Sequence, residues 1–225
     1  MAELLGIWRD MKVAKDAFYS ERTNMVRNQL IPNQIYDSRI LDAMESVPRH
    51  IFVEEKWRPV AYVDENIPAC VGRKLLSPLL LAKMLSCCNL KDNATVLDVG
   101  FGSGYSIALL AKIVKSVTAI ESNEHMLFLA ADNVSSLGIS NYICMHGDLS
   151  EGPMDGNNFD AIIVNGILSV SPDGKPDKLI SQLKKAGVLV VIEKVANVSV
   201  LVKYSHTQGS VIRKELQIVD APYIA

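Results

Sequence analysis

Two kinds of pattern alternate along the chain from residue 94 onward, and this alternation most constrains the fold. Short apolar runs that are typical of buried strands alternate with segments whose apolar residues recur at helical spacing. The predicted strands are residues 94–99, 116–121, 141–148 and 159–165, and the predicted helices are residues 105–114, 124–138 and 175–187. Strands that alternate with helices build a parallel sheet with helices on both faces. We therefore expect a doubly wound α/β fold.

The last part of the chain lacks the long helices. Three strands follow one another at residues 187–194, 198–205 and 210–219. The last two are expected to form a hairpin around Thr207, Gln208 and Gly209, because turn residues there separate two apolar runs. The sheet is therefore expected to be mostly parallel and to end in an antiparallel edge.

The first 76 residues have a different character, with helical periodicity followed by a loop-rich stretch. Helices are predicted over residues 4–30 and 37–47, and Asp37 is a plausible N-cap of the second. We predict an N-terminal helical and loop extension at residues 1–76 and an α/β domain at residues 77–225, which together form one compact unit.

Composition disfavours several other classes of protein. Of the 225 residues, 49% are hydrophobic and 21% charged, as in an ordinary globular domain, and the net charge of -2 gives no basic excess for nucleic acid. No apolar run reaches the roughly 18 residues of a membrane span, and the charged N-terminus lacks a signal-peptide core. The cysteines and histidines lack the spacing of metal ligands, so we expect no metal site, reduced thiols and a cytoplasmic protein.

A glycine-rich turn follows the first strand of the α/β part. Residues 96–105 read VLDVGFGSGY, in which Gly100, Gly102 and Gly104 alternate. Such a turn either makes a tight strand-to-helix connection or brings backbone close to a ligand. The GxGxxG pattern of dinucleotide-binding folds fits poorly, because Tyr105 and Ile107 stand where a third small residue is required. The pattern therefore disfavours a nicotinamide dinucleotide.

Acids at three successive strand ends point to a different ligand. Asp98 would repel a pyrophosphate but attract a cation, since unit charges about 4 Å apart interact by roughly 4 kcal/mol near a protein surface. Glu121 lies about 20 residues beyond the glycine turn, the spacing of an acid that binds ribose hydroxyls. Asp148 suits the exocyclic amine of adenine. Together they match S-adenosylmethionine, an adenosine with a cationic tail.

Two of these acids also have a purely structural interpretation. Glu121 can act as a capping acid for the helix that follows it, and Asp148 can be an ordinary turn residue. Asn165 ends a further predicted strand and would line the same rim of the sheet as the acids.

Several segments together resemble the protein-L-isoaspartate O-methyltransferases. The resemblance covers most of the chain from about Met25, through MVRNQL, DSRILDAMESVPRHIFVEE, AYVDENIP, VLDVGFGSGYSIALLAKIVKSVTAIE, HGDLSEG and FDAIIVN. The glycine turn alone indicates only a methyltransferase, whereas the VPRHIFV and AYVDENIP stretches are more specific to this family. The resemblance implies a seven-stranded, Rossmann-like methyltransferase sheet, with the N-terminal extension on the substrate side.

The resemblance also implies an activity and roles for individual residues. The enzyme would use S-adenosyl-L-methionine to methylate the α-carboxyl of L-isoaspartyl residues in damaged proteins, which are therefore the implied partners. The cofactor-binding residues implied are Asp98, Gly100, Gly102 and Gly104 around the methionine part, Glu121 at the ribose, Asp148 and Leu149 at the adenine, and also Ser122 and Asn165.

Two departures from the family pattern set this chain apart. The family usually reads G-x-T-I-S-Q-P before the helix that precedes the cofactor strand, whereas residues 72–78 read GRKLLSP. Leu76 therefore stands at the serine usually assigned to the catalytic site, and Ser77 stands at the glutamine. Asn165 and Gly166 stand where the family commonly has threonine and small residues. The combination resembles an alphaproteobacterial branch of the family.

The first departure affects the expected mechanism. A carboxylate acceptor is ionised at pH 7 and needs no general base, so catalysis consists mostly of alignment in a water-poor site. Ser77 is the predicted catalytic hydroxyl, although a serine before Pro78 is also an apt helix N-cap. Arg73 and Lys74 either offer positive charge to an anionic substrate or are solvated loop cations.

Three other functions stay open at this point. One is a methyltransferase with a different carboxylate or a small-molecule acceptor, and another is an S-adenosylmethionine-binding protein without transferase activity. The third, a nicotinamide oxidoreductase, fits the glycine turn least well.

Overall fold

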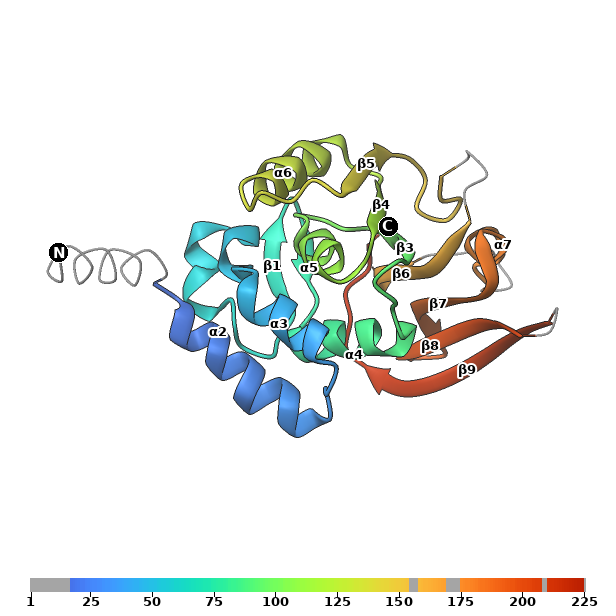
Figure 1. Ribbon diagram of the computed structural model, residues 1–225, viewed down its shortest axis with the longest axis horizontal. Helices are drawn as coiled ribbons and strands as arrows, with labels where there is room; N and C mark the ends of the chain where they lie inside the picture. The colour runs from blue at the N-terminus through green and yellow to red at the C-terminus, as the bar shows by residue number, and fades with distance from the viewer. Residues whose placement is uncertain (1–16, 154–157, 169–174, 208–209, 225) are drawn as a thin grey trace, which may run out of the picture.

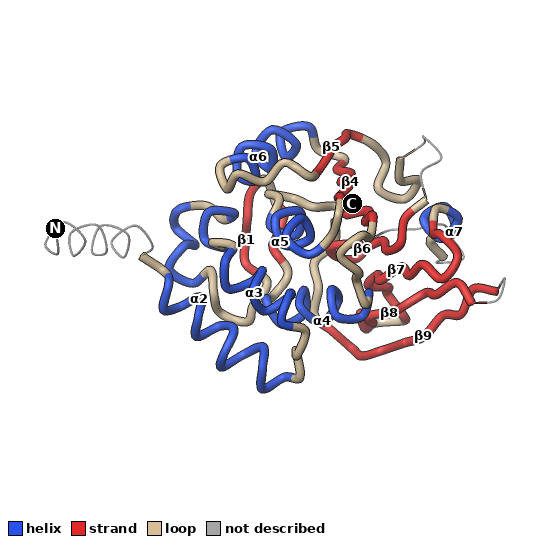
Figure 2. Tube along the Cα trace, in the orientation of Figure 1, coloured by secondary structure: helices blue, strands red, loops and turns tan. Residues whose placement is uncertain are grey.

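A seven-stranded sheet forms the centre of the computed structural model, which describes residues 17–153, 158–168, 175–207 and 210–224 (Figures 1 and 2). The strand order is β5-β4-β3-β6-β7-β8-β9. The strands are β3 (Thr95–Val99), β4 (Ser116–Glu121), β5 (Tyr142–His146), β6 (Phe159–Ile167), β7 (Leu183–Val195), β8 (Val198–Thr207) and β9 (Ser210–Val219). The first five in this order are parallel, and β8 and β9 add two antiparallel pairings. The expected sheet is confirmed; Gln208 and Gly209 of the predicted hairpin turn lie outside the described residues.

Among the described residues, four α-helices accompany the strands of the sheet. They are α4 (Pro78–Cys88), α5 (Tyr105–Ile113), α6 (Glu124–Ser135) and α7 (Asp177–Ser181). Ser77 caps α4 by accepting a hydrogen bond from the backbone N of Leu80 at 3.3 Å, and Asn123 caps α6 in the same way through the N of His125 at 3.0 Å. Gly138 has a φ of +71° just beyond α6, as expected of a residue that ends a helix.

The predicted helix over residues 175–187 is wrong in its second half. Only Asp177–Ser181 is helical, and β7 already begins at Leu183, opposite Phe159 of β6. The backbone N of Phe159 donates to the carbonyl of Gln182 at 2.8 Å, and Lys184 forms an ion pair with Asp160 at 2.8 Å. Pairing with β6 therefore outweighs the helical periodicity of this short stretch.

The N-terminal part of the described chain is built from short helices and one small hairpin. Its elements are α2 (Tyr19–Met25), the π-helical turn η1 (Val26–Leu30), the 3-10 turn η2 (Ile31–Asn33), α3 (Ser38–Ser46), the 3-10 turns η3 (Arg49–Phe52) and η4 (Glu55–Val60), and the antiparallel pair β1 (Ile67–Cys70) and β2 (Arg73–Leu75). The predicted cap is confirmed, since Asp37 accepts from the backbone N of Arg39 at 3.0 Å. Residues 4–16 of the first predicted helix lie outside the described residues.

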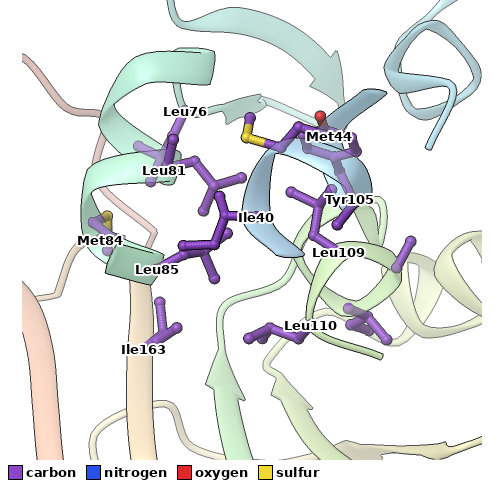
Figure 3. Close-up of a cluster of buried hydrophobic side chains, with 14 of the residues drawn as sticks. Ile40, Met44, Leu76, Leu81, Met84, Leu85, Tyr105, Leu109, Leu110 and Ile163 are labelled. Atoms are coloured by element: carbon purple, nitrogen blue, oxygen red, sulfur yellow. The ribbon is translucent and has the colours of Figure 1, made fainter. Parts of the chain in front are cut away.

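One hydrophobic cluster joins this N-terminal part to the sheet. Figure 3 shows Ile40 and Met44 of α3 beside Leu85 of α4 and Leu109 of α5, and all four are buried. In Figure 1 the N-terminal helices lie at the opposite end of the molecule from the β8–β9 hairpin. The division at residue 76 stays a prediction, but residues from both of its sides share this cluster.

A short segment after β9 returns to the centre of the sheet. The backbone N of Ile167 donates to the carbonyl of Pro222 at 2.8 Å, and the N of Ile224 donates to the carbonyl of Ile167 at 3.0 Å. The Ile224 side chain fills the space beside two glycines, since a Cβ added to Gly100 or to Gly166 would lie 2.6 Å from it. No helix among the described residues has the length and apolar character needed to cross a bilayer.

Candidate functional site

The carboxyl ends of β3, β4 and β6 meet at one rim, where the glycine turn begins. Gly100 and Gly102 have φ values of +69° and +57°, a region that side chains with a Cβ rarely adopt. A Cβ added to Gly102 would meet nothing within 4 Å, so this glycine leaves its side of the turn open. Gly104 has another reason to be glycine, because its added Cβ would lie 3.0 Å from Ala130 and Val134 of α6. The turn therefore combines close packing with an open face.

Asp98 of β3 lies buried beneath this turn with two neutral partners. One carboxylate oxygen accepts from the hydroxyl of Ser106 at 2.6 Å, and the other accepts from Nδ2 of Asn165. Burial raises the pKa of Asp98 to about 6, although the two hydrogen bonds lower it and Glu121 nearby raises it further. Asp98 is therefore a carboxylate without a counter-cation in the described part of the chain, as a site for an ammonium group requires.

Asn165 holds Asp98 in position rather than facing the rim as an independent ligand. Its Nδ2 donates both to Asp98 and, at 3.1 Å, to the carbonyl of Val99, and the residue is 8% exposed. Both partners belong to β3, so the amide ties the end of β6 to the end of the neighbouring strand. This position is one where the chain departs from the family pattern described above.

Glu121 at the end of β4 is also fully buried, but its partners differ from those of Asp98. Oε2 accepts from the backbone N of Gly102 at 3.0 Å, and Oε1 accepts from the backbone N of Ser122 at 2.9 Å. Oε1 also forms an ion pair with Nη2 of Arg73, the first residue of β2. A hydrogen bond to the glycine turn thus fixes the carboxylate, and a cation from the β1–β2 hairpin neutralises it.

The predicted adenine residues lie at the end of the next strand, β5. Asp148 is exposed and accepts hydrogen bonds at 2.7 Å from both the backbone N and the hydroxyl of Ser150, which lower its pKa. Leu149 beside it is buried. The structure therefore brings together Asp98, Gly100, Gly102, Glu121, Ser122 and Asn165. Asp148 follows the adjacent strand end, since the backbone N of Gly147 donates to the carbonyl of Glu121 at 3.1 Å. The adenine role of Asp148 stays a prediction.

Residues 73–76, from the segment that departs from the family pattern, form the opposite wall of a narrow pocket over the glycine turn. Residues 73–76 line the pocket together with Gly102, Tyr105, Asn165 and Ile224. Leu76 is buried and lies beside Leu81 in the hydrophobic cluster of Figure 3. Ser77, the predicted catalytic hydroxyl, instead caps α4 and lines a separate cavity between α4 and β9. Its catalytic role therefore has no geometric support on this side of the molecule.

Arg49 is hydrogen-bonded to the segment that forms this wall, and this role was not predicted from the sequence. The side chain is fully buried, with Nε donating to the carbonyl of Ala61 at 2.7 Å and Nη2 donating to the carbonyl of Leu76 at 2.8 Å. Its guanidinium carbon lies 5.0 Å from the centre of the Tyr105 ring, which lines the pocket. No pattern in the sequence predicts such a buried arginine, because its partners are backbone carbonyls.

Comparison with known proteins identifies the family. The model of the family described as protein-L-isoaspartate(D-aspartate) O-methyltransferase matches residues 20–223. The chain belongs to this family. It is 35% identical over 207 residues to the protein-L-isoaspartate O-methyltransferase of Roseiflexus castenholzii, covering 92% of each chain, and 36% identical over 178 residues to that of Synechococcus sp., covering 79% of this chain and 71% of the relative.

Solved structures agree on the fold of the family. A Plasmodium falciparum protein described as a protein-L-isoaspartate O-methyltransferase, crystallised with S-adenosyl-L-homocysteine, superposes with a TM-score of 0.76 at 22% identity and covers 91% of this chain and 98% of that one. Membership of the family makes S-adenosylmethionine the cofactor of this chain. The buried Asp98 and the open face of Gly102 fit that cofactor, whereas Oε1 of Glu121 can accept from a ribose hydroxyl only once Arg73 has moved.

Proposed function

We propose that this chain transfers a methyl group from S-adenosylmethionine to the α-carboxyl of L-isoaspartyl residues in proteins or peptides. The family match carries this assignment, because residues 20–223 include both the cofactor rim and the N-terminal segment that covers it. The activity is a repair step, since methylation of isoaspartate leads to a succinimide and back to aspartate.

The residues of the rim are those that would hold the cofactor. Asp98 would receive the ammonium of the methionine part, Glu121 the ribose hydroxyls, and the open face of Gly102 would lie against the ligand. When bound, the cofactor supplies an electrophilic methyl carbon whose bond to sulfur breaks as an acceptor oxygen attacks, with the electron pair left on sulfur. Binding and orientation are therefore the tasks of the protein.

The pocket supports this chemistry by excluding water rather than by supplying a base. The apolar side chains of Leu76, Phe101 and Ile224 line it and are each at most 5% exposed. A carboxylate acceptor is already ionised at neutral pH, so no proton has to be removed. Leu76 in place of the usual serine therefore leaves a direct displacement feasible, provided that other groups orient the acceptor.

The experiment that tests the function uses a matched pair of peptides. Transfer of labelled methyl from S-adenosylmethionine is measured on one peptide that contains L-isoaspartate and on a second that contains normal aspartate in the same sequence. Methylation of the isoaspartyl peptide alone is the expected result. Binding of S-adenosyl-L-homocysteine without transfer to either peptide would overturn the assignment while leaving the fold and cofactor intact.

One observation favours a second candidate, a methyltransferase of the same family with another acceptor. Leu76 is buried against Leu81 where the family usually presents a hydroxyl, so acceptor recognition has changed at this wall. A Leu76→Ser variant that gains isoaspartyl methylation, while the wild type methylates only other carboxylates, would support it. We further propose a reducing cytoplasmic location, which is consistent with four cysteines that are all free thiols.

A further inference from the structure

Arg73 binds the carboxylate that a ribose would need. Its Nη2 contacts Oε1 of Glu121, which also accepts from the backbone N and the hydroxyl of Ser122. A carboxylate oxygen offers about two lone pairs, so protein donors already use Oε1 fully. Since the Glu121 side chain is fully buried and that of Arg73 is 12% exposed, the pair is shielded from solvent. Ribose hydroxyls must therefore compete with Arg73 for this oxygen.

The pocket that Arg73 lines beside the glycine turn has little free space while Arg73 stays in place. Its volume is about 20 Å³, room for about one water molecule. Arg73 lines this pocket together with Gly102. A ligand group that enters this pocket beside Gly102 therefore displaces the Arg73 side chain.

Two features lower the free-energy cost of separating Arg73 from Glu121. Nη1 of Arg73 is buried and has no hydrogen-bond partner among the described residues, so part of the guanidinium gains a partner by moving. The turn before Arg73 is strained, because Val71, a β-branched residue, has a φ of +45°. The hairpin that carries Arg73 is therefore not at its own conformational optimum.

The displaced guanidinium would face a pocket that offers it no replacement acid. Among the described residues that line the pocket, the charged ones are Arg73 and Lys74, and none is Asp or Glu. Asp98 is not available to Arg73, because Ser106 and Asn165 donate to its oxygens and the proposed function assigns its charge to the cofactor ammonium. A carboxylate from outside the chain is the partner that satisfies Arg73 there, and a guanidinium binds a carboxylate through two parallel hydrogen bonds.

We propose that Arg73 binds the acceptor carboxylate, and that its ion pair with Glu121 prevents this binding until the cofactor ribose replaces Arg73 at Glu121. This inference rests on the proposed function, since that function makes the acceptor a carboxylate. It explains how the acceptor is oriented without the hydroxyl that Leu76 replaces. It also predicts the order in which the two ligands bind, because Arg73 becomes available to the acceptor carboxylate only after the cofactor has bound.

The test measures the binding of each ligand separately. Affinity for S-adenosyl-L-homocysteine is measured by calorimetry, and affinity for a fluorescent isoaspartyl peptide is measured by anisotropy with and without S-adenosyl-L-homocysteine. We expect the wild type to bind the peptide about tenfold more tightly when S-adenosyl-L-homocysteine is present, equal to about 1.4 kcal/mol. Arg73→Gln should bind S-adenosyl-L-homocysteine more tightly, bind the peptide about tenfold more weakly in its presence, and lose the dependence of one ligand on the other.

Three further variants keep the inference falsifiable. Glu121→Gln should bind the peptide without any cofactor, because Arg73 is no longer held by a charge, and Arg73→Lys should recover part of the peptide affinity. Lys112→Gln removes an exposed charge at the end of α5 and should match the wild type throughout.

The outcomes separate this inference from the proposed function. Wild-type methyl transfer to the isoaspartyl peptide together with unchanged peptide affinity in Arg73→Gln would overturn the role of Arg73 alone. Weaker S-adenosyl-L-homocysteine binding in Arg73→Gln would overturn the competition at Glu121. Failure of the wild type to methylate the peptide would overturn the proposed function, and the acceptor role of Arg73 with it.

Discussion

The two walls of the pocket are built in opposite ways. On one wall, parallel strands of the central sheet present Asp98 and Glu121 at adjacent ends, and backbone or side-chain donors hold each carboxylate. On the other wall, the β1–β2 hairpin and the following Leu76 depend on a strained turn at Val71 and on the buried Arg49. Each wall carries one departure from the family pattern, Asn165 and Gly166 on the sheet wall and residues 72–78 on the hairpin wall. The departure on the hairpin wall bears more on the reaction, because it replaces the serine usually assigned to the catalytic site.

Replacement of Glu121 is expected to have the largest effect, because it removes the ion pair with Arg73 that joins the two walls. Glu121→Ala leaves the Arg73 guanidinium buried without its carboxylate, so we expect the free energy of unfolding to fall by about 3 to 5 kcal/mol. Urea denaturation measures the loss. The double variant Glu121→Ala/Arg73→Met should recover much of it, because no uncompensated charge remains. A loss that the second substitution does not reduce would show that the two residues are not coupled.

Replacement of Arg49 tests how far the hairpin wall depends on its anchor. Arg49→Met leaves the carbonyls of Ala61 and Leu76 without their donors, and we expect a loss of about 3 kcal/mol in the free energy of unfolding. Arg58→Met, which removes an exposed arginine, is the matched control. Equal losses in the two variants would contradict the anchoring role of Arg49.

The pH dependence of cofactor binding tests the sheet wall. Burial raises the pKa of Asp98 from 3.8 to about 6, so the charge that attracts the cofactor ammonium is lost as the pH falls below about 6. We expect affinity for S-adenosyl-L-homocysteine, measured by calorimetry between about pH 5 and about pH 8, to weaken up to tenfold per unit below that pKa. Asp98→Asn should bind weakly at every pH, whereas Asp42→Asn, an exposed control on α3, should follow the wild type.

The raised pKa of Asp98 gives stability a pH dependence opposite to that of cofactor binding. Because the pKa of Asp98 is higher in the folded than in the unfolded chain, its contribution to stability is full below about pH 4 and is lost as the pH rises through about 6. Asp98→Asn should therefore gain stability relative to the wild type at neutral pH while it loses cofactor affinity. Loss of both together would argue that the hydrogen bonds of Asp98, rather than its charge, dominate.

Ser77 gives the smallest expected effect and separates catalysis from capping. Ser77→Ala removes the cap of α4, and we expect about 1 kcal/mol less stability with kcat for the isoaspartyl peptide changed less than about twofold. Asp37→Ala removes the corresponding cap of α3 and serves as the control. A kcat that falls a hundredfold or more in Ser77→Ala alone would restore the predicted catalytic role of its hydroxyl.

The sequence predicted the sheet wall well, and the physical reason is local. Alternating strand and helix patterns dictate a parallel sheet, and in such a sheet the residues at successive strand ends must meet at one edge. Asp98 and Glu121 therefore come together as predicted, and the family assignment from these motifs is confirmed. The early start of β7 was missed, because its pairing with Phe159 depends on a strand that is remote in sequence.

The hairpin wall was not predictable in the same way. Its residues were read as loop, since a strand of three residues carries no periodic pattern. The contact between Arg73 and Glu121 joins residues 48 positions apart, and that between Arg49 and Leu76 joins residues 27 apart. Neither contact leaves a trace in local sequence, because a buried arginine looks the same as an exposed one until the fold is known.

Because Ile224 packs beside Gly100, the ligand site is completed only after residue 224 has been synthesised. The glycine turn emerges from the ribosome long before residue 224, yet the side chain that closes it comes from that late segment. A nascent chain can pair β3 with β4 before this side chain has been made, but its ligand site stays incomplete. A ligand stabilises only the chains that bind it, so we expect the cofactor to protect chains that already include residue 224 better than shorter nascent chains.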